Sequence, residues 1–434
     1  MLKFKWETEF KETEIGEIPK DWRIEKLRWA IKSLETGNRP KGGSLQYDPN
    51  GILSIGGENI SWEGDLILDG CLRFTESFYN SLKKGKIKEK DILLVKDGAT
   101  IGKLAFIKYV PEGKAMVNEH VFLIRTNEKE YYPRFLFYFL FSDVGQLQIE
   151  SSISGSAQGG INRSILETIK IPKFDLNEQS RIATVLSWFD DLIENKKRQN
   201  EILEKVAMAI FKSWFVDFEP FKDEEFVYNE ELGKEIPKEW KVKKLGKLIK
   251  IESGGYAPQG EKYFTNGKYP FVRVKHLSNQ PCINGCDFIN DDAVRDYKLK
   301  LFKEGSIIFQ KSGESLSFAR VNILPFDCYI VNHLAIVDSA ESKNLGFIYC
   351  VLKNLLFEII EERTGTALPY MKISDIQKKI ILKPPDSILQ RFHSLVEPLF
   401  QKIILNQKQI MVLRKIRDAL LPKLVFGKLR VMEI

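Results

Sequence analysis

Several motifs in the sequence come close to catalytic signatures, but none of them is complete. The segment Gly98–Lys103 (GATIGK) resembles a phosphate-binding loop, yet its spacing differs from G-x-x-x-x-G-K-[ST] and no hydroxyl residue follows the lysine. The segment Lys383–Asp386 (KPPD) is not the Asn/Asp-Pro-Pro-Tyr/Phe loop with which amino-methyltransferases hold a flipped base. The sequence contains no H-E-x-x-H and no G-x-S-x-G motif. We therefore predict no catalytic residue in this chain.

A zinc site is the second chemistry that the residue types suggest. Cys282 and Cys286, with His276 nearby, are residues that ligate zinc in other proteins. A fourth ligand with a standard spacing is lacking, so we interpret both as ordinary loop cysteines and predict no metal site. The five cysteines of the chain do not form a disulfide framework either.

Two histidines have matching neighbours. His120 lies close to Asn118 and His333 directly follows Asn332, and both histidines come after β-type runs. No nucleophile or orienting acid recurs with them. A structural or DNA-contacting role is therefore favoured over a catalytic one.

The elements that must position these residues occur twice along the chain. Glu17–Trp22 (EIPKDW) returns as Glu235–Trp240 (EIPKEW), and Asp91–Gly98 corresponds to Ser306–Gly313. The shift between the copies falls from 218 to 215 and then to 210 residues, which indicates a duplication with a few loop deletions. A period this long excludes a solenoid repeat, so we predict two copies of one domain.

Length and composition set the outer bounds. At about 150 residues per domain, 434 residues suggest about three domains, and 43% hydrophobic residues exclude general disorder. No apolar run approaches the roughly 18 residues of a membrane span, and the charged N-terminal residues do not resemble a signal peptide. We therefore expect a cytoplasmic protein. The net charge of +7 permits nucleic-acid binding without requiring it.

Each copy ends in a long stretch with few helix breakers, at residues 177–217 and 387–421. Apolar residues recur there at a spacing of three and four, which predicts two amphipathic helices, each roughly 60 Å long, that pack against each other. The first stripe is Val185, Trp188, Leu192, Ile202, Val206 and Ala209, and the second is Leu389, Phe392, Val396, Leu399, Ile403, Ile410, Leu413 and Leu420.

Polar residues and a proline interrupt the two stripes. Asn195 and Asn406 fall at matching places, where buried asparagines would fix the register of the helix pair. The alternative is that both are exposed at imperfect heptads. Pro398 interrupts the second helix, and we expect it to kink that helix or to separate its first turns.

Aromatic side chains gather on the first helix. The cluster at residues 210–215 is explained either by core packing, where the helix meets a globular domain, or by a docking surface for another protein. The candidates for partner docking are Trp188, Phe189, Phe211, Trp214 and Phe215.

The strings that close the two helices are similar to a known family. Ala209–Pro220 (AIFKSWFVDFEP), Arg417–Val425 (RDALLPKLV) and the paired Ile-Pro-Lys-Asp/Glu-Trp openings resemble hallmarks of the specificity subunits of type I restriction–modification systems. The resemblance runs from Gly16 to Val431 and accounts for the duplication.

This resemblance implies an α+β fold with pseudo-twofold symmetry. Two similar α/β target recognition domains (residues 1–175 and 220–386) would be joined by two long antiparallel coiled-coil helices (residues 176–219 and 387–434). Each domain would read one half of a bipartite, asymmetric site in double-stranded DNA. The helices would fix the spacing of the two halves.

The resemblance also implies a division of labour among subunits. This chain would be a non-catalytic subunit that binds no cofactor. Two modification subunits would dock on it and methylate the DNA with S-adenosylmethionine. Restriction subunits that use ATP and Mg²⁺ would carry out cleavage.

Loops with cations, amides and glycines are the expected DNA-contacting segments. Phosphates are contacted by Lys, Arg and backbone amides, and base edges are read by Arg, Lys, Asn and Gln. The candidates are Arg39, Lys41, Lys96, Gln158, Asn162 and Arg163 in the first copy, and Tyr256, Gln259, Arg273, Lys275, Lys311, Ser315, Tyr370 and Lys372 in the second. Residues 54–63 and 272–281 differ between the copies, which predicts two different half-sites.

Two other classes of protein stay open at this stage. The chain could be a coiled-coil scaffold whose repeated domains bind proteins, or a self-sufficient DNA enzyme such as a fused methyltransferase. A salt-dependent affinity for duplex DNA separates the leading interpretation from the first of these. A lack of binding to S-adenosylmethionine argues against the second.

Overall fold

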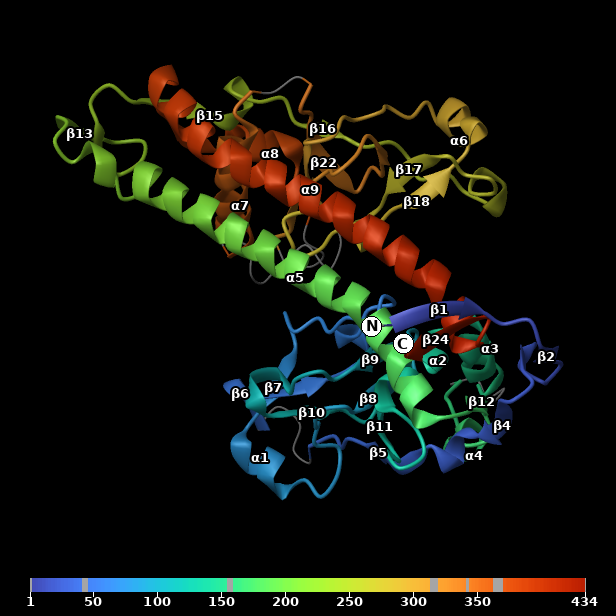
Figure 1. Ribbon diagram of the computed structural model, residues 1–434. Coiled ribbons are helices and arrows are strands. Elements are labelled where there is room, and N and C mark those ends of the chain that lie inside the picture. Colours follow the sequence, from blue (N-terminus) through green and yellow to red (C-terminus); the bar gives the residue numbers. More distant parts are fainter. Residues whose placement is uncertain are drawn as a thin grey trace. The chain divides into compact units, whose positions relative to one another are not determined.

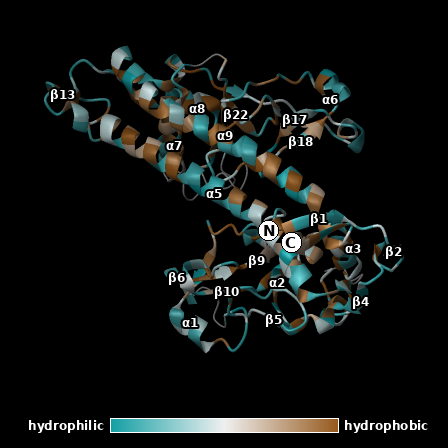
Figure 2. Cartoon of the chain, viewed as in Figure 1, coloured by the Kyte–Doolittle hydropathy of each residue, from teal (hydrophilic) through white to brown (hydrophobic). Residues whose placement is uncertain are grey.

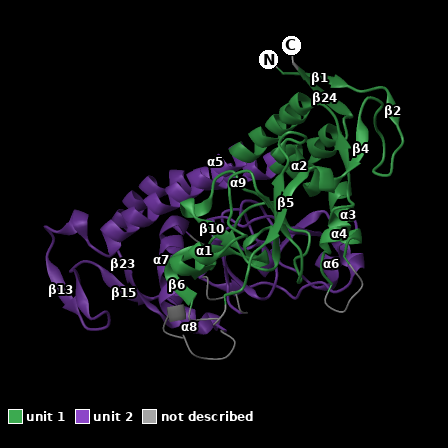
Figure 3. Cartoon of the chain, turned by 90° about the horizontal axis from the view of Figure 1, so that it is seen from below, with its two compact units in different colours: residues 1–191, 414–434 green, residues 192–413 purple. Residues whose placement is uncertain are grey.

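The computed structural model describes residues 2–40, 46–153, 159–312, 319–340, 343–361 and 370–433. The chain forms two compact units (Figure 3). Unit 1 contains residues 1–191 and 414–434, and unit 2 contains residues 192–413. Each unit holds one copy of the duplicated domain together with parts of both long helices.

Unit 1 is built around a four-stranded antiparallel sheet in the order β5-β11-β8-β9. The strands are β5 (Ile31–Thr36), β11 (Val121–Thr126), β8 (Ile92–Val95) and β9 (Leu104–Phe106). All four residues of β8 are buried, because apolar side chains cover both faces of this strand. A three-stranded sheet joins β10 (Ala115–Val117), β6 (Tyr47–Ile55) and β7 (Leu72–Phe74).

Unit 2 repeats this arrangement. Its four-stranded sheet has the order β16-β22-β19-β20 and consists of β16 (Glu252–Ser253), β22 (Leu334–Val337), β19 (Ile307–Gln310) and β20 (Val321–Ile323). Its three-stranded sheet joins β18 (Asp287–Ile289), β17 (Tyr269–Val272) and β21 (Tyr329–Ile330). The matching strand order confirms that the sequence duplication is a duplication of one fold.

Smaller elements complete both units (Figure 1). The two-stranded pairs are β4 (Arg23–Lys26) with β12 (Lys170–Lys173), β2 (Phe10–Lys11) with β3 (Ile18–Pro19), β15 (Lys241–Lys244) with β23 (Ile380–Lys383), and β13 (Phe226–Asn229) with β14 (Lys234–Pro237). The shorter helices are α1 (Glu76–Ser81), α2 (Pro133–Phe141), α3 (Asp143–Ser151), α4 (Arg163–Leu166), α6 (Asp291–Asp296), α7 (Leu345–Glu361) and α8 (Ile373–Lys378).

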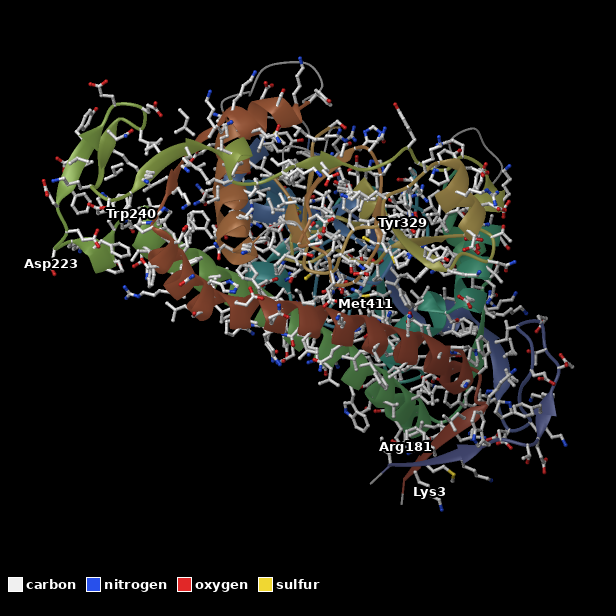
Figure 4. The ribbon with its side chains drawn as sticks, turned by 90° about the horizontal axis from the view of Figure 1, so that it is seen from above. Lys3, Arg181, Asp223, Trp240, Tyr329 and Met411 are labelled. Carbon is white, nitrogen blue, oxygen red and sulfur yellow. The ribbon has the colours of Figure 1, made fainter. Side chains whose placement is uncertain are left out.

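Both ends of the described chain belong to unit 1. Strand β1 (Leu2–Trp6) pairs antiparallel with β24 (Leu429–Glu433). Arg430 on β24 forms ion pairs with Glu7, Asp21 and Glu178, and its guanidinium lies 5.5 Å from the Trp22 ring centroid. Figure 4 shows Arg181 of a long helix at the same end as Lys3 of β1. The strand pair is thereby anchored to the helix.

The two long helices are α5 (Leu176–Phe215) and α9 (Asp386–Val425), with 40 residues each. Both show hydrophobic and hydrophilic faces (Figure 2). They run antiparallel, since Asp190 contacts Arg417 in unit 1 and Asn200 contacts Asn406 in unit 2. No helix in the described ranges is both long and apolar enough to span a bilayer.

The helix α9 continues through Pro398 without a break, so of the two expected outcomes the separation of the first turns is wrong, and a kink stays a prediction. An interior proline costs about 3 kcal/mol. Burial of a large apolar side chain stabilises by about 2 kcal/mol, and Phe392, Val396 and Phe400 around the proline are all buried. Packing therefore offsets the local cost of the proline.

The buried seam of α5 is not the stripe predicted from the sequence. The buried positions recur every seven residues at Leu186, Ile193, Asn200 and Ala207. Of the predicted stripe, Val185 is buried, whereas Trp188, Leu192, Ile202 and Val206 are exposed. The helix carries two apolar rows with the same helical period, and periodicity alone does not distinguish the row that meets α9.

The polar layer in the seam contains Asn406, as predicted, but a different asparagine of α5 contacts it. Asn406 is buried, and its Nδ2 donates to Asn200 Oδ1 at 3.0 Å and to Gln199 Oε1 at 3.2 Å. Asn195 is exposed and accepts from Gln199, so the prediction that Asn195 shares the seam with Asn406 is wrong. The role of Asn406 in fixing the register stays a prediction.

Candidate nucleic-acid interface

A lysine and a histidine are brought together by the same backbone frame in both units. In unit 1, the N–H of Lys96 donates to His120 O at 2.9 Å, and its carbonyl accepts from Ile161 N at 2.7 Å. In unit 2, the N–H of Lys311 donates to His333 O at 3.1 Å, and its carbonyl accepts from Met371 N at 2.8 Å. We call this frame the Lys–His clamp. It joins the end of a central strand to the segment that precedes α4 or α8.

The clamp of unit 1 is nearly neutral in charge. Asp97 accepts hydrogen bonds from both Lys96 Nζ and His120 Nδ1. Partial burial opposes ionisation, but the bonds from Lys96 and His120 hold the pKa of Asp97 below its ordinary value. Arg39 Nε lies 2.7 Å from Glu119 Oε1, so the nearby arginine is also paired. This clamp presents hydrogen-bonding groups with little excess charge.

The clamp of unit 2 differs in charge, because none of the described residues places an acid beside its lysine. Ser312 stands where unit 1 has Asp97, and its Oγ lies 2.8 Å from His333 Nδ1. Lys311 Nζ donates to Ser253 Oγ at 2.9 Å, and the described residues place no carboxylate within 4 Å of this ammonium. Burial lowers the pKa of Lys311. A half-buried ammonium that donates to a hydroxyl is well suited to an anionic partner such as a phosphate.

Two further candidates of unit 2 flank its clamp. Tyr370 forms an isolated β-bridge with Ser312 and is 51% exposed. Lys372 is exposed and precedes α8 as its N-cap residue. Both side chains are therefore accessible to a nucleic acid that reaches the clamp.

Other candidate side chains already have partners within the chain. Asn162 caps α4 by accepting from Ser164 N at 2.9 Å, and Arg163 pairs with Glu167 at 3.0 Å. Arg273 and Lys275 both form ion pairs with Asp287. A nucleic acid would have to displace these partners or accept a weaker contact.

The remaining DNA candidates are divided between exposed and undescribed residues. Tyr256 is 75% exposed, and Gln259 is held by Tyr297 and Ala257. Lys41, Gln158 and Ser315 lie outside the described residues.

His276 has a structural role in unit 2. Its Nδ1 accepts from Arg273 N at 2.9 Å, and burial lowers the pKa of His276 to about 4. Asn59 occupies the matching position in unit 1, where its Oδ1 accepts from Gly56 N at 3.0 Å. Cys282 is buried, which raises the pKa of its thiol. Over the described ranges, no three His, Cys, Asp or Glu residues are grouped as metal ligands.

The candidates for partner docking differ in exposure. Phe211 and Phe215 are buried in the core of unit 2, where both contact Phe347 and Phe392, so the docking prediction is wrong for these two residues. Core packing explains them instead. Trp188 is 51% exposed.

The other two docking candidates are half-buried. Trp214 packs against the unit 2 core beneath Arg391, and Phe189 packs against the unit 1 core.

Sequence reasoning missed a second set of exposed apolar residues on the long helices. These are Ile202 and Val206 on α5, and Leu405, Val412 and Ile416 on α9, each at least 42% exposed. The sequence did contain a signal for this surface, because Ile202 and Val206 form an apolar row that was assigned to the buried stripe. Once Asn200 and Ala207 fill the seam, that row must face away from α9. Unpartnered apolar rows of this kind are typical of helix-docking surfaces.

The chain matches a known family over most of its length. Residues 19–205 and 237–415 match the family described as the type I restriction modification DNA specificity domain. The MjaIX type I restriction enzyme specificity subunit of Methanocaldococcus jannaschii is 50% identical over 436 residues, which cover 100% of this chain and 99% of that protein. The HindI specificity subunit of Haemophilus influenzae is 24% identical over 92% of this chain and 99% of its own length.

Two solved structures align with most of the chain, at low identity and low TM-score. The S subunit of a type I restriction–modification system from M. genitalium aligns with 93% of this chain and 96% of its own, at 19% identity and a TM-score of 0.49. The HsdS subunit from Thermoanaerobacter tengcongensis aligns with 95% of this chain and 98% of its own, at 17% identity and a TM-score of 0.35.

Proposed function

Because this chain belongs to the specificity subunits of type I restriction–modification systems, we propose that it selects a bipartite DNA site for partner enzymes and has no catalytic step of its own. The observation that carries this proposal is the Lys–His clamp, which recurs at matching places in both units. A repeated frame that presents cations and hydrogen-bonding groups fits two contacts to one duplex.

The two clamps would read different half-sites. Asp97 in unit 1 accepts hydrogen bonds, whereas Ser312 in unit 2 both donates and accepts. A carboxylate next to the contact favours a base-edge donor such as cytosine N4, and the ammonium of Lys311 favours phosphate or guanine acceptors. The proposed DNA site is therefore asymmetric.

The long helices would have two tasks. As a rigid antiparallel pair, α5 and α9 would hold the two readers at a set spacing. Their exposed apolar rows would receive two modification subunits, and restriction subunits would join that complex. S-adenosylmethionine, ATP and Mg²⁺ would be bound by those partners, because the sequence of this chain carries no motif for any of them.

A genome-wide map of methylated adenines, recorded with and without this gene, tests the proposal. We expect methylation to disappear at one split motif with a fixed gap when the gene is deleted, and to return with a plasmid copy. If the map is unchanged while the partner subunits are expressed and active, the proposed role is refuted. A symmetric motif with identical halves would refute the asymmetric reading alone.

A further inference from the structure

Four lysines form an exposed basic surface on unit 2, which we call the lysine face. They lie on β15 and on the adjoining 3₁₀ turn η6 (Leu245–Lys247), and are Lys241, Lys243, Lys244 and Lys247. All four are exposed, and the described part of the chain places no carboxylate within 4 Å of any of their ammonium groups. An array of like charges without partners is costly in the free protein and suits a polyanion.

The matching surface of unit 1 is largely neutralised. Its strand β4 reads Arg-Ile-Glu-Lys where β15 reads Lys-Val-Lys-Lys, so Glu25 stands where Lys243 lies in unit 2. Arg23 pairs with Glu25 at 3.3 Å, and Lys170 on the neighbouring strand pairs with Glu14 at 3.3 Å. The lysine face is therefore a property of one unit and not of the duplicated fold.

The few acids near the lysine face do not cancel its charge. Asp386 lies 2.7 Å from Lys383, and this hydrogen bond lowers the pKa of Asp386. Asp375 lies 3.9 Å from Lys378. Asp386 is hydrogen-bonded to Lys383, and the charges of Lys243 and Lys241 also lower its pKa, so this single carboxylate offsets only part of the charge of the four lysines.

The lysine face continues the candidate nucleic-acid interface of unit 2. Lys372 beside the Lys–His clamp is the N-cap residue of α8. Beyond the end of this helix, Lys379 O accepts from Leu245 N at 2.9 Å, which ties the helix to η6. The lysine face therefore lies next to the helix that begins at the clamp of unit 2.

We propose that the lysine face binds the sugar-phosphate backbone of duplex DNA that flanks the half-site read by unit 2. The inference rests on the proposed function and adds a contact that only one side of the site receives. A protein partner fits less well, since lysine is depleted in protein interfaces and the lysine face contains no aromatic anchor. The footprint of the full chain would then extend farther beyond one half-site than beyond the other.

The test measures DNA affinity of the full-length chain between 50 and 200 mM salt, on a duplex that carries the methylated motif with long flanks. One variant replaces the four lysines by Gln, and a second replaces them by Arg. The control removes the same charge at four exposed lysines elsewhere, namely Lys3, Lys5, Lys205 and Lys222. Thermal unfolding of each variant reports whether the fold is kept.

Loss of four phosphate contacts should reduce the slope of log affinity against log salt by about 3.6. The parent chain should therefore lose about 100-fold more affinity over this salt range than the Gln variant. The Arg variant and the control should keep the slope of the parent. Shortening the flank beside the unit 2 half-site should produce the same change in the parent and none in the Gln variant.

Two results would overturn the inference. If the Gln variant keeps both the parent slope and the sensitivity to flank length, the lysine face does not contact DNA. If it keeps the slope but no longer binds modification subunits, the lysine face is a protein docking surface. A parent chain that does not bind the motif at all would instead refute the proposed function, so the two failures are distinguishable.

Discussion

The side chain of Asp190 joins three elements of unit 1, and its removal is the sharpest test of how the long helices are anchored. On α5, Asp190 Oδ1 accepts from Arg417 Nη1 of α9 at 2.9 Å. Its Oδ2 accepts from the Tyr138 hydroxyl and lies 3.4 Å from Arg134 Nη2, both on α2. The side chains of Arg417 and Arg134 are only 10% and 17% exposed.

The substitution Asp190→Ala should cost about 3 kcal/mol of unfolding free energy. Breaking a buried ion pair by removing one partner costs about 3–5 kcal/mol, because the other charge stays buried. The lower end applies here, since the Asp190 side chain is 22% exposed and Arg417 keeps Asp418 at 2.9 Å. At about 2.1 cal/mol/K per residue, a unit of about 210 residues should melt about 7 °C lower.

Differential scanning calorimetry measures this shift, and the neighbouring acid supplies a matched control. Asp191 is 45% exposed, pairs with Lys108 at 2.8 Å and lies 3.8 Å from Arg134, which keeps Asp190, so Asp191→Ala should cost under about 1 kcal/mol. Asp190→Asn should fall between the two, because an amide still accepts from Tyr138. If Asp190→Ala and Asp191→Ala shift the melting temperature equally, the reasoning about buried charge is refuted.

Three further outcomes are expected. The pKa of His276 is lowered to about 4, so below pH 6.5 the unfolded chain binds a proton that the folded chain does not. The free energy of unfolding should therefore fall by about 1–2 kcal/mol as the pH falls from 7 to 5. The variant His276→Asn should remove that loss in urea titrations at both pH values, and an unchanged pH dependence would contradict the assignment. In DNA-binding titrations, Lys311→Gln should weaken affinity about 10-fold and Lys96→Gln less than about threefold, because a carboxylate already offsets the charge of Lys96. Equal losses would count against the difference between the clamps. The double variant Ile202→Asp and Val206→Asp should weaken binding of modification subunits at least about 10-fold in pull-down titrations and leave DNA affinity intact. A parallel loss of DNA affinity would show damage to the fold instead.

Much of the fold was predictable because it depends on long patterns. The duplication was visible in the repeated Ile-Pro-Lys-Asp/Glu-Trp openings, and the second long helix buries Phe392, Val396 and Ile403 as its stripe predicts. The seam of α5 was not predictable in the same way. Asn200 and Trp188 lie on two rows with equal helical period, and only the packing of α9 decides which row is buried.

The candidate site was predictable in its frame and not in its side-chain pairing. His120 and His333 could be matched from their neighbours in the sequence, and the structure places each beside the lysine of its clamp. The pairing of Lys96 with Asp97, and of Lys311 with Ser253, depends on where separate loops meet in space. Composition also predicted a mild positive net charge. The concentration of positive charge on β15 of unit 2 was not predictable, because it depends on which lysines lack an acidic neighbour in space.

The pairing of β1 with β24 has a practical consequence for anyone who handles this protein. A tag on either terminus would lie beside the other terminus. Residues of the tag would then compete with β1 or β24 for the backbone hydrogen bonds of this two-stranded sheet. Trimming the last strand would remove Val431, which is fully buried, and would leave Glu178 and Glu7 without Arg430. In expression trials, a short deletion at this end should therefore behave like a core mutation and lower the soluble yield of the chain.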